Sequence, residues 1–260
     1  MMFGNNDTAL VRLSRPSVAA FGAALLALVP LTTALAQEDT SPINTERPSF
    51  SASPLTLSTG SWQIETGYQY TDDESVTIDT LPNLLVRYGF AEAWEAQLGW
   101  AGESRVDFGP GTVRGASDVS VGVKRTLTEP GAQTAFALFG GGSLPTGNRA
   151  FSSDSVDPSV GVFWTHDAEL SWFGTALLNE SDGDLLLSNA VGLSFSLAPN
   201  TGAYVEYVGQ FPDGGGPAHT LNAGVSYTPR YNMQWDVYGG TGLNDRAADW
   251  FFGFGFAIRL

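Results

Sequence analysis

Alternation of apolar and polar residues is the dominant pattern along the chain from residue 61 onward. The first such segment, SWQIETGYQYT (61–71), places large apolar or aromatic residues on one face and Gln63, Glu65, Gly67 and Gln69 on the other. Segments 93–102 and 116–127 repeat the pattern. A two-residue period indicates β-strands with two chemically different faces, and no stretch after residue 36 shows a helical period of useful length. The sequence therefore predicts an all-β protein.

Twelve segments of this kind are expected, and the connections between them alternate in length. The expected strands cover residues 61–71, 81–90, 93–102, 116–127, 132–143, 157–166, 169–179, 186–198, 202–211, 218–228, 232–242 and 249–260. Tight turns such as GFAEA and APNTG alternate with longer acidic loops such as TDDESVTIDTL and GESRVDFGPGTVRGA. An even number of strands, with short turns at one rim and long loops at the other, is typical of transmembrane antiparallel β-barrels of the bacterial outer membrane.

The chemistry of the two faces favours a membrane barrel over a soluble one. A secreted β-sandwich or a lipocalin-like barrel also alternates, but it packs its apolar face inward. Here one face is mostly Gly, Ser, Asn, Gln and charged residues, whereas the other carries Leu, Val and aromatics. Aromatic residues lie near the strand ends, as an interfacial girdle requires: Trp62, Tyr70, Trp94, Trp100, Trp164, Trp172, Tyr227, Trp235 and Trp250. A closed barrel with a wet interior satisfies both faces and leaves no unpaired edge.

The first 36 residues have the features of a cleaved signal peptide. Arg12 and Arg15 precede the apolar run VAAFGAALLALVPLTT, and Ala34 and Ala36 provide the small residues that a signal peptidase requires. Because Pro30 interrupts the run and the run is short for a spanning helix, cleavage is favoured over an uncleaved anchor. The expected organisation is a signal peptide (1–36), a periplasmic leader or partial lumen plug (37–60) and an outer-membrane barrel (61–260) with both termini periplasmic.

Composition narrows the functional classes. The chain has no cysteine, which excludes a disulfide framework, a thiolate zinc site and a thiol nucleophile. Its formal net charge is −15, and we find no basic patch that could bind nucleic acid. Acids dominate the expected long loops, but NESDGD (179–184) lacks the ligand spacing of a calcium loop. We expect no metal site and no cofactor.

Several segments resemble one family of outer-membrane proteins. The stretch 43–70 contains an acid-Arg-Pro motif, a Ser-Pro pair and Gly-x-x-Gln-x-Glu-x-Gly, formed by Glu46, Arg47, Pro48, Ser53, Pro54, Gly60, Gln63, Glu65 and Gly67. With LFGGGSLPTGN (138–148) and GLNDRAADWFFGFGFAIRL (242–260), it resembles the family labelled "putative MetA-pathway of phenol degradation". The resemblance implies an outer-membrane barrel that transports aromatic or other hydrophobic compounds.

The inward parity of the strands places eight ionisable side chains in the lumen, and these are the candidate selectivity residues: Glu65, Arg87, Glu95, Asp118, Lys124, Glu206, Asp236 and Arg259. One interpretation is a lattice of ion pairs that stiffens the barrel, and the other is a ring that selects a permeant. A barrel of twelve strands is intermediate in width between an eight-stranded barrel, whose interior is filled by side chains, and a sixteen-stranded porin, which holds an aqueous channel. A narrow channel is therefore expected.

The proline-containing segment 41–59 precedes the first strand and is either a flexible periplasmic linker or a plug folded into the lumen. Glu46, Arg47 and Pro48 are the candidate plug residues, and Arg47 beside Glu65 or Glu95 is one way of anchoring the plug. We expect a plug or a periplasmic constriction.

An enzyme would have to use one of two histidines. His166 lies at a tight turn, and His219 lies at the outer rim in phase with lipid-facing residues. Because Gly-x-Ser-x-Gly is absent and no triad partner can be assigned, we expect no catalytic residue and no enzyme.

The leading expectation is therefore an outer-membrane channel that passes small, aromatic or hydrophobic compounds by diffusion along a polar lumen. The alternatives are a structural or adhesive barrel acting through its acidic loops and, less favoured, a lipid-modifying enzyme. The expected partners are outer-membrane lipid, lipopolysaccharide, the small-molecule permeant and the barrel-assembly machinery, which would read the apolar terminal strand 249–260.

Overall fold

The computed structural model describes residues 40–153, 155–181 and 183–260, so the expected signal peptide lies outside the described residues. These residues form fourteen strands: β1 (Trp62–Asp73), β2 (Val76–Ala91), β3 (Trp94–Trp100), β4 (Glu103–Asp107), β5 (Thr112–Ala116), β6 (Val119–Thr126), β7 (Thr134–Leu144), β8 (Asp157–His166), β9 (Ser171–Ser181), β10 (Asp184–Ala198), β11 (Thr201–Pro212), β12 (Ala218–Arg230), β13 (Met233–Gly242) and β14 (Trp250–Arg259). Within this part of the chain there is no helix long and apolar enough to cross a bilayer.

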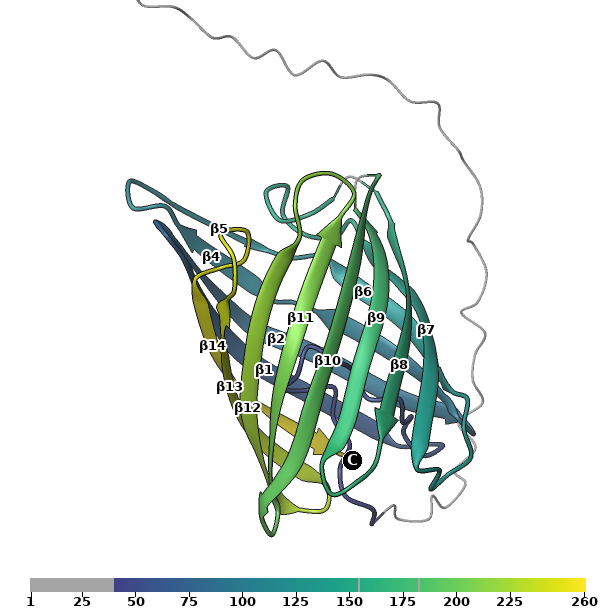
Figure 1. Ribbon diagram of the computed structural model, residues 1–260. Coiled ribbons are helices and arrows are strands. Elements are labelled where there is room, and N and C mark those ends of the chain that lie inside the picture. The colour runs from purple at the N-terminus through teal and green to yellow at the C-terminus, as the bar shows by residue number, and fades with distance from the viewer. Residues whose placement is uncertain (1–39, 154, 182) are drawn as a thin grey trace, which may run out of the picture. The chain divides into compact units, whose positions relative to one another are not determined.

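Twelve of the strands close into an antiparallel barrel (Figure 1). Each barrel strand pairs with its neighbours in chain order, except that β3 pairs directly with β6 because β4 and β5 lie outside the ring. The last strand pairs with the first along its whole length, from Gln63 opposite Arg259 to Asp72 opposite Trp250. The predicted twelve-stranded barrel is confirmed, and the apolar terminal segment is the strand that closes it.

Two expected loops are instead continuations of strands. Only residues 74–75 separate β1 from β2, and only 182–183 separate β9 from β10. The stretch VTIDT (76–80) alternates like the rest of β2, but the neighbouring acids gave it the composition of a loop. A third expected loop contains the hairpin β4–β5, which pairs with the extended part of β2 and projects from the rim (Figure 1).

The two faces of the wall differ as the alternation predicts. Large apolar side chains point outward and remain exposed, including Val237 (58 % exposed) and Trp235 (53 %). The inward face carries buried polar and small residues, among them Gln63, Arg87 and Ala257. A face of this composition is stable against acyl chains, so the exposed apolar surface is a lipid-facing surface.

Inward aromatic rings lie against the wall over glycines of the adjacent strand. A Cβ at Gly122 would collide with the Phe139 ring, and one at Gly253 would collide with the Tyr238 ring. The pairs Phe173 with Gly192 and Tyr204 with Gly224 repeat the arrangement. Glycine on one strand therefore makes room for a ring from the next, which explains why glycine is frequent on the inward face.

Candidate functional site

The segment before β1 lies inside the barrel rather than below it (Figure 1). We call residues 41–60 the leader. Its backbone and side chains bond to inward groups on many strands, from Glu65 on β1 to Arg259 on β14. Since these strands surround the lumen, the leader crosses it.

Wall carboxylates hold the leader by its backbone. Glu65 accepts hydrogen bonds from the N–H of Glu46 at 3.0 and 3.1 Å, and Glu95 accepts one from Leu57 at 2.9 Å. On the opposite wall, Glu206 accepts the N–H groups of Phe50 and Ser51, each at 2.9 Å. Hydrogen bonds from N–H to an ionised carboxylate are stronger than neutral ones. The barrel thus satisfies several of the leader's backbone donors, as a buried irregular segment requires.

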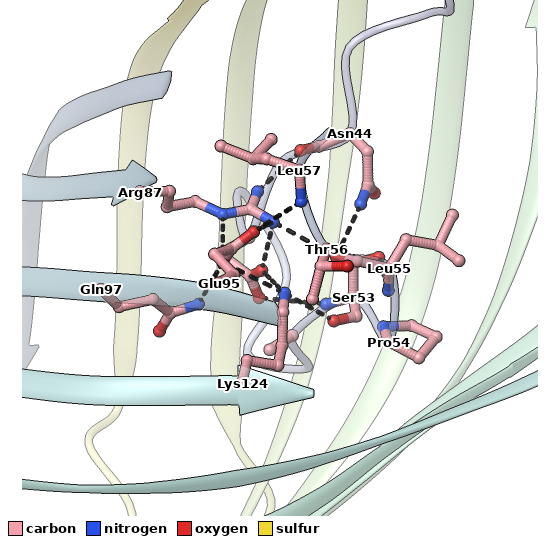
Figure 2. Close-up of polar contacts among 12 residues, drawn as sticks. Asn44, Ser53, Pro54, Leu55, Thr56, Leu57, Arg87, Glu95, Gln97 and Lys124 are labelled. Carbon is pink, nitrogen blue, oxygen red and sulfur yellow. Dashed lines mark hydrogen bonds and ion pairs between the residues drawn. The ribbon is translucent and has the colours of Figure 1, made fainter. Parts of the chain in front are cut away.

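Five of the charged groups form one buried cluster (Figure 2 shows Arg87, Glu95 and Lys124 with their leader partners). Arg87 forms ion pairs with Glu46 (3.0 Å), Glu65 (3.1 Å) and Glu95 (2.8 Å). Lys124 pairs with Glu46 and, at 3.5 Å, with Glu95. Arg87 and Lys124 also donate to the carbonyl oxygens of Asn44 and Ser53, so the cluster ties leader backbone to β2 and β6. Buried ion pairs of this kind are costly to break, at about 3–5 kcal/mol when one partner is removed.

Arg47 does not pair with Glu65 or Glu95, so the suggested anchor was wrong. Its guanidinium forms an ion pair with Asp236 on β13 at 3.3 Å and lies 5.5 Å from the centre of the Tyr238 ring. Glu65 and Glu95 both form ion pairs with Arg87, so their charge is already compensated without Arg47. Arg47 also packs against Gly255, where any side chain would collide with the guanidinium.

Residues that carry no charge complete the attachment and were not among the candidates. Gln63 donates to the carbonyl of Asn44, and Tyr204 donates to the carbonyl of Pro48. Gln234 donates to Thr45, and Thr126 and Thr175 bond leader residues 52–56. Arg259, which is charged and was among the candidates, donates to the carbonyl of Ser41 at 2.6 Å. Inward parity places the glutamines and threonines in the lumen as well, but they carry no charge and were not expected to act as selectivity residues.

Asp118 lies apart from the other candidates, immediately before β6, where it holds a loop. Its carboxylate accepts the N–H of Thr146 (2.9 Å), Gly147 (2.7 Å) and Ser153 (3.1 Å). Burial alone would raise the pKa of Asp118, but hydrogen bonds from Ser152, Gly147, Ser153 and Thr146 outweigh it and hold that pKa below the ordinary 3.8. Asp118 therefore fastens the β7–β8 loop and takes no part in the cluster around Arg87.

Two cavities flank the leader. The rim that carries the short β6–β7, β8–β9 and β10–β11 turns is called the turn rim. One cavity, of about 780 Å³, opens toward this rim and is lined by Ile43, Thr45 and Phe173. The other, of about 590 Å³, lies toward the opposite, loop rim and is lined by Arg47, Phe50 and Tyr238. Ser49 lines both, so the leader is the partition between them.

The two histidines lie away from the leader. His166 Nδ1 is 2.7 Å from the hydroxyl of Thr134, and His219 Nδ1 is 2.6 Å from the hydroxyl of Tyr207. His219 also stacks on the Tyr207 ring with centroids 5.9 Å apart. Among the described residues, no group of three or more His, Asp or Glu could hold a metal ion.

Comparison with known proteins gives a family and several structural relatives. A family model described as "Putative MetA-pathway of phenol degradation" matches residues 45–260. An outer membrane channel from Pseudomonas putida F1 is similar with a TM-score of 0.59 at 11 % identity, over 82 % of this chain and 99 % of that one. The NanC porin gives 0.54 at 12 % identity (76 % and 100 %), and the KdgM porin gives 0.52 at 13 % (75 % and 98 %). No curated protein matches.

A closed barrel with an apolar outer face, a polar lumen and these structural relatives defines a transmembrane β-barrel of the outer-membrane class. Within that class, the chain belongs to the family described as "Putative MetA-pathway of phenol degradation", because the family model matches the whole barrel together with most of the leader. The sequence resemblance to this family is thereby confirmed.

Proposed function

We propose that the protein is a diffusion channel for small aromatic or otherwise hydrophobic compounds, and that the leader limits passage through its lumen. The observation that carries the proposal is the position of the leader, bonded across the barrel between two cavities. The description of the family, and the channel and porin titles of the structural relatives, support the same function.

The direction of the barrel belongs to the proposal. The turn rim, where β14 ends and the leader enters, would face the periplasm, and the loop rim would face the medium. A permeant would enter the cavity at the loop rim, pass the leader and leave at the turn rim. The charged cluster around Arg87 would then fix the leader and bias the lumen electrostatically.

The proposal includes no catalytic step. Each histidine already faces a hydroxyl that belongs to a threonine or a tyrosine rather than to a serine nucleophile. A structural or adhesive role through acidic loops stays the competing interpretation, and conductance measurements separate it from a channel.

Removing residues 41–58 tests the function. In planar bilayers with potassium chloride, we expect the deleted protein to show a severalfold larger single-channel current than the full-length barrel, because the partition between the cavities is gone. The control is a deletion within the β4–β5 hairpin, outside the closed ring. Unchanged conductance after leader deletion would leave the leader no part in permeation, and absence of current from both proteins would favour the structural interpretation.

A further inference from the structure

The leader is not attached evenly around the lumen. The hydrogen bonds and ion pairs described above reach β1, β2, β3, β6, β9, β11, β13 and β14, and none of them reaches β7, β8, β10 or β12, of which only β7 and β8 are adjacent to each other. Adjacent leader residues bridge the gap, since the N–H of Ala52 bonds Thr175 on β9 and the carbonyl of Ser53 accepts from Lys124 on β6. Because β7 and β8 lie between β6 and β9 in the sheet, the leader crosses in front of them.

The strand register shows what the leader covers there. Thr126, Ala137, Phe163 and Thr175 form one continuous row across β6, β7, β8 and β9. The two threonines at the ends of the row bond leader residues 52–56. Between them, Ala137 and Phe163 offer no polar atom, yet they are 0 % and 5 % exposed. The middle of the row is therefore buried by apolar packing, between two ends that hydrogen-bond the leader.

Cavities lie above and below this row. The cavity at the turn rim reaches Ala135 and Thr165, one inward position below Ala137 and Phe163. A third cavity of about 400 Å³, on the loop-rim side, is lined by Phe139 and Ser159. The Phe139 and Phe163 rings touch, with centroids 5.8 Å apart. We call Ala137, Phe139 and Phe163 the apolar window.

We propose that permeants cross from the loop-rim side to the turn-rim side at the apolar window, between leader residues 52–56 and β7–β8, and that Phe163 determines the width of solute admitted. This inference rests on the proposed channel function. Apolar packing can separate without leaving a hydrogen bond unmade, whereas separating the leader from Glu65 or Glu206 leaves buried N–H donors without their acceptor. The window is thus the side at which the leader yields most easily, and its lining suits an uncharged solute that carries an aromatic ring.

Swelling of liposomes that contain the full-length protein tests the inference with two uncharged, bilayer-impermeant probes, glucose and phenyl glucoside. Phe163→Ala should raise the rate for phenyl glucoside severalfold, and Phe163→Trp should abolish it. Phe136→Ala is the matched control, because Phe136 lies on β7 but faces lipid at 41 % exposure; its rates should equal those of the wild type. Phe163→Leu, which removes less volume, serves if the alanine variant does not insert, as judged by heat-modifiable electrophoretic mobility.

The outcomes separate the inference from the function beneath it. If wild type and leader-deleted protein both pass the probes but no Phe163 variant alters either rate, the route lies elsewhere and only the inference is overturned. If neither wild type nor leader-deleted protein passes any probe, the channel function fails and the inference fails with it.

Discussion

Glu206 is a luminal carboxylate whose hydrogen-bond partners carry no charge. In the described part of the chain it forms no ion pair, and its oxygens accept from the N–H of Phe50 and Ser51 and from the amide of Asn222. It is 1 % exposed. A buried carboxylate in this setting is stabilised by its donors, and the donors in turn depend on it.

Glu206→Ala should therefore loosen the leader. Two backbone N–H groups lose their acceptor, and we expect docking to weaken by about 1–3 kcal/mol for each. Proteinase K added to the reconstituted barrel should cut the leader faster in the variant. The control is Glu129→Ala, which removes an exposed carboxylate from the β6–β7 turn. Equal cleavage of the leader in the wild type and Glu206→Ala would contradict this account of Glu206.

At the scale of single residues, the sequence predicts which way a side chain points but not which group it contacts. Alternation alone placed Glu65, Glu206 and Asp236 on the inward face, and all three are buried there. Their partners depend on strand register and on the path of the leader, which has no periodicity to read. For that reason the pairing of Arg47 with Asp236, 189 residues away, could not be predicted.

Strands were more predictable than the connections between them. All twelve barrel strands appear near their expected ranges, because alternation over about ten residues specifies both the strand and its faces. The β4–β5 hairpin was missed since Phe108 to Gly111 and the surrounding charges have loop composition. Its strands, ESRVD and TVRGA, are too short for their alternation to outweigh that signal.

The loop between β7 and β8 should detach when Asp118 loses its charge. The pKa of Asp118 is lower in the folded protein than its ordinary 3.8, so its stabilising effect is present above that value and is lost as the pH falls through the lower, folded value. We expect wild-type loop 145–153 to resist protease at pH 5 and above, and Asp118→Asn to be cut already at pH 7.

Asp107→Asn is the matched control for this loop. Asp107 has a lowered pKa for a similar reason, a hydrogen bond from the N–H of Gly109, but it lies in the β4–β5 hairpin and does not touch loop 145–153. Cleavage of the loop at equal rates in Asp107→Asn and Asp118→Asn would show that Asp118 does not fasten it.

The whole barrel depends on the difference between its two faces rather than on a packed apolar core. Val237, near the middle of β13, points outward. Val237→Arg should cost about 2–4 kcal/mol of folding free energy, because a cation on the lipid face near the midplane is poorly solvated. Equilibrium unfolding from lipid vesicles measures this difference. Leu243→Arg, at an exposed position beyond the end of β13, should cost less than about 1 kcal/mol; equal costs would contradict the membrane placement of β13.

At the scale of the whole molecule, the closure of the barrel and the class of protein were predictable from the sequence, whereas the arrangement inside the lumen was not. Relatives of 11–13 % identity share the barrel, which shows that the pattern of faces specifies the architecture without particular residues. The cavities and the crossing path of the leader arise from side chains of many strands at once, and no local segment of the sequence encodes them.

Several hydrogen-bond partners of the leader lie far from it in sequence, and this separation constrains the order in which the barrel can assemble. Its partners include Glu206, 155 and 156 residues away, Asp236, 189 residues away, and Arg259, 218 residues away. Such contacts have high contact order and cannot form until the C-terminal strands are in place. A nascent barrel that has assembled only through β10 can therefore bond the leader to β1, β2, β3, β6 and β9 alone, and the attachments to β11, β13 and β14 are made last.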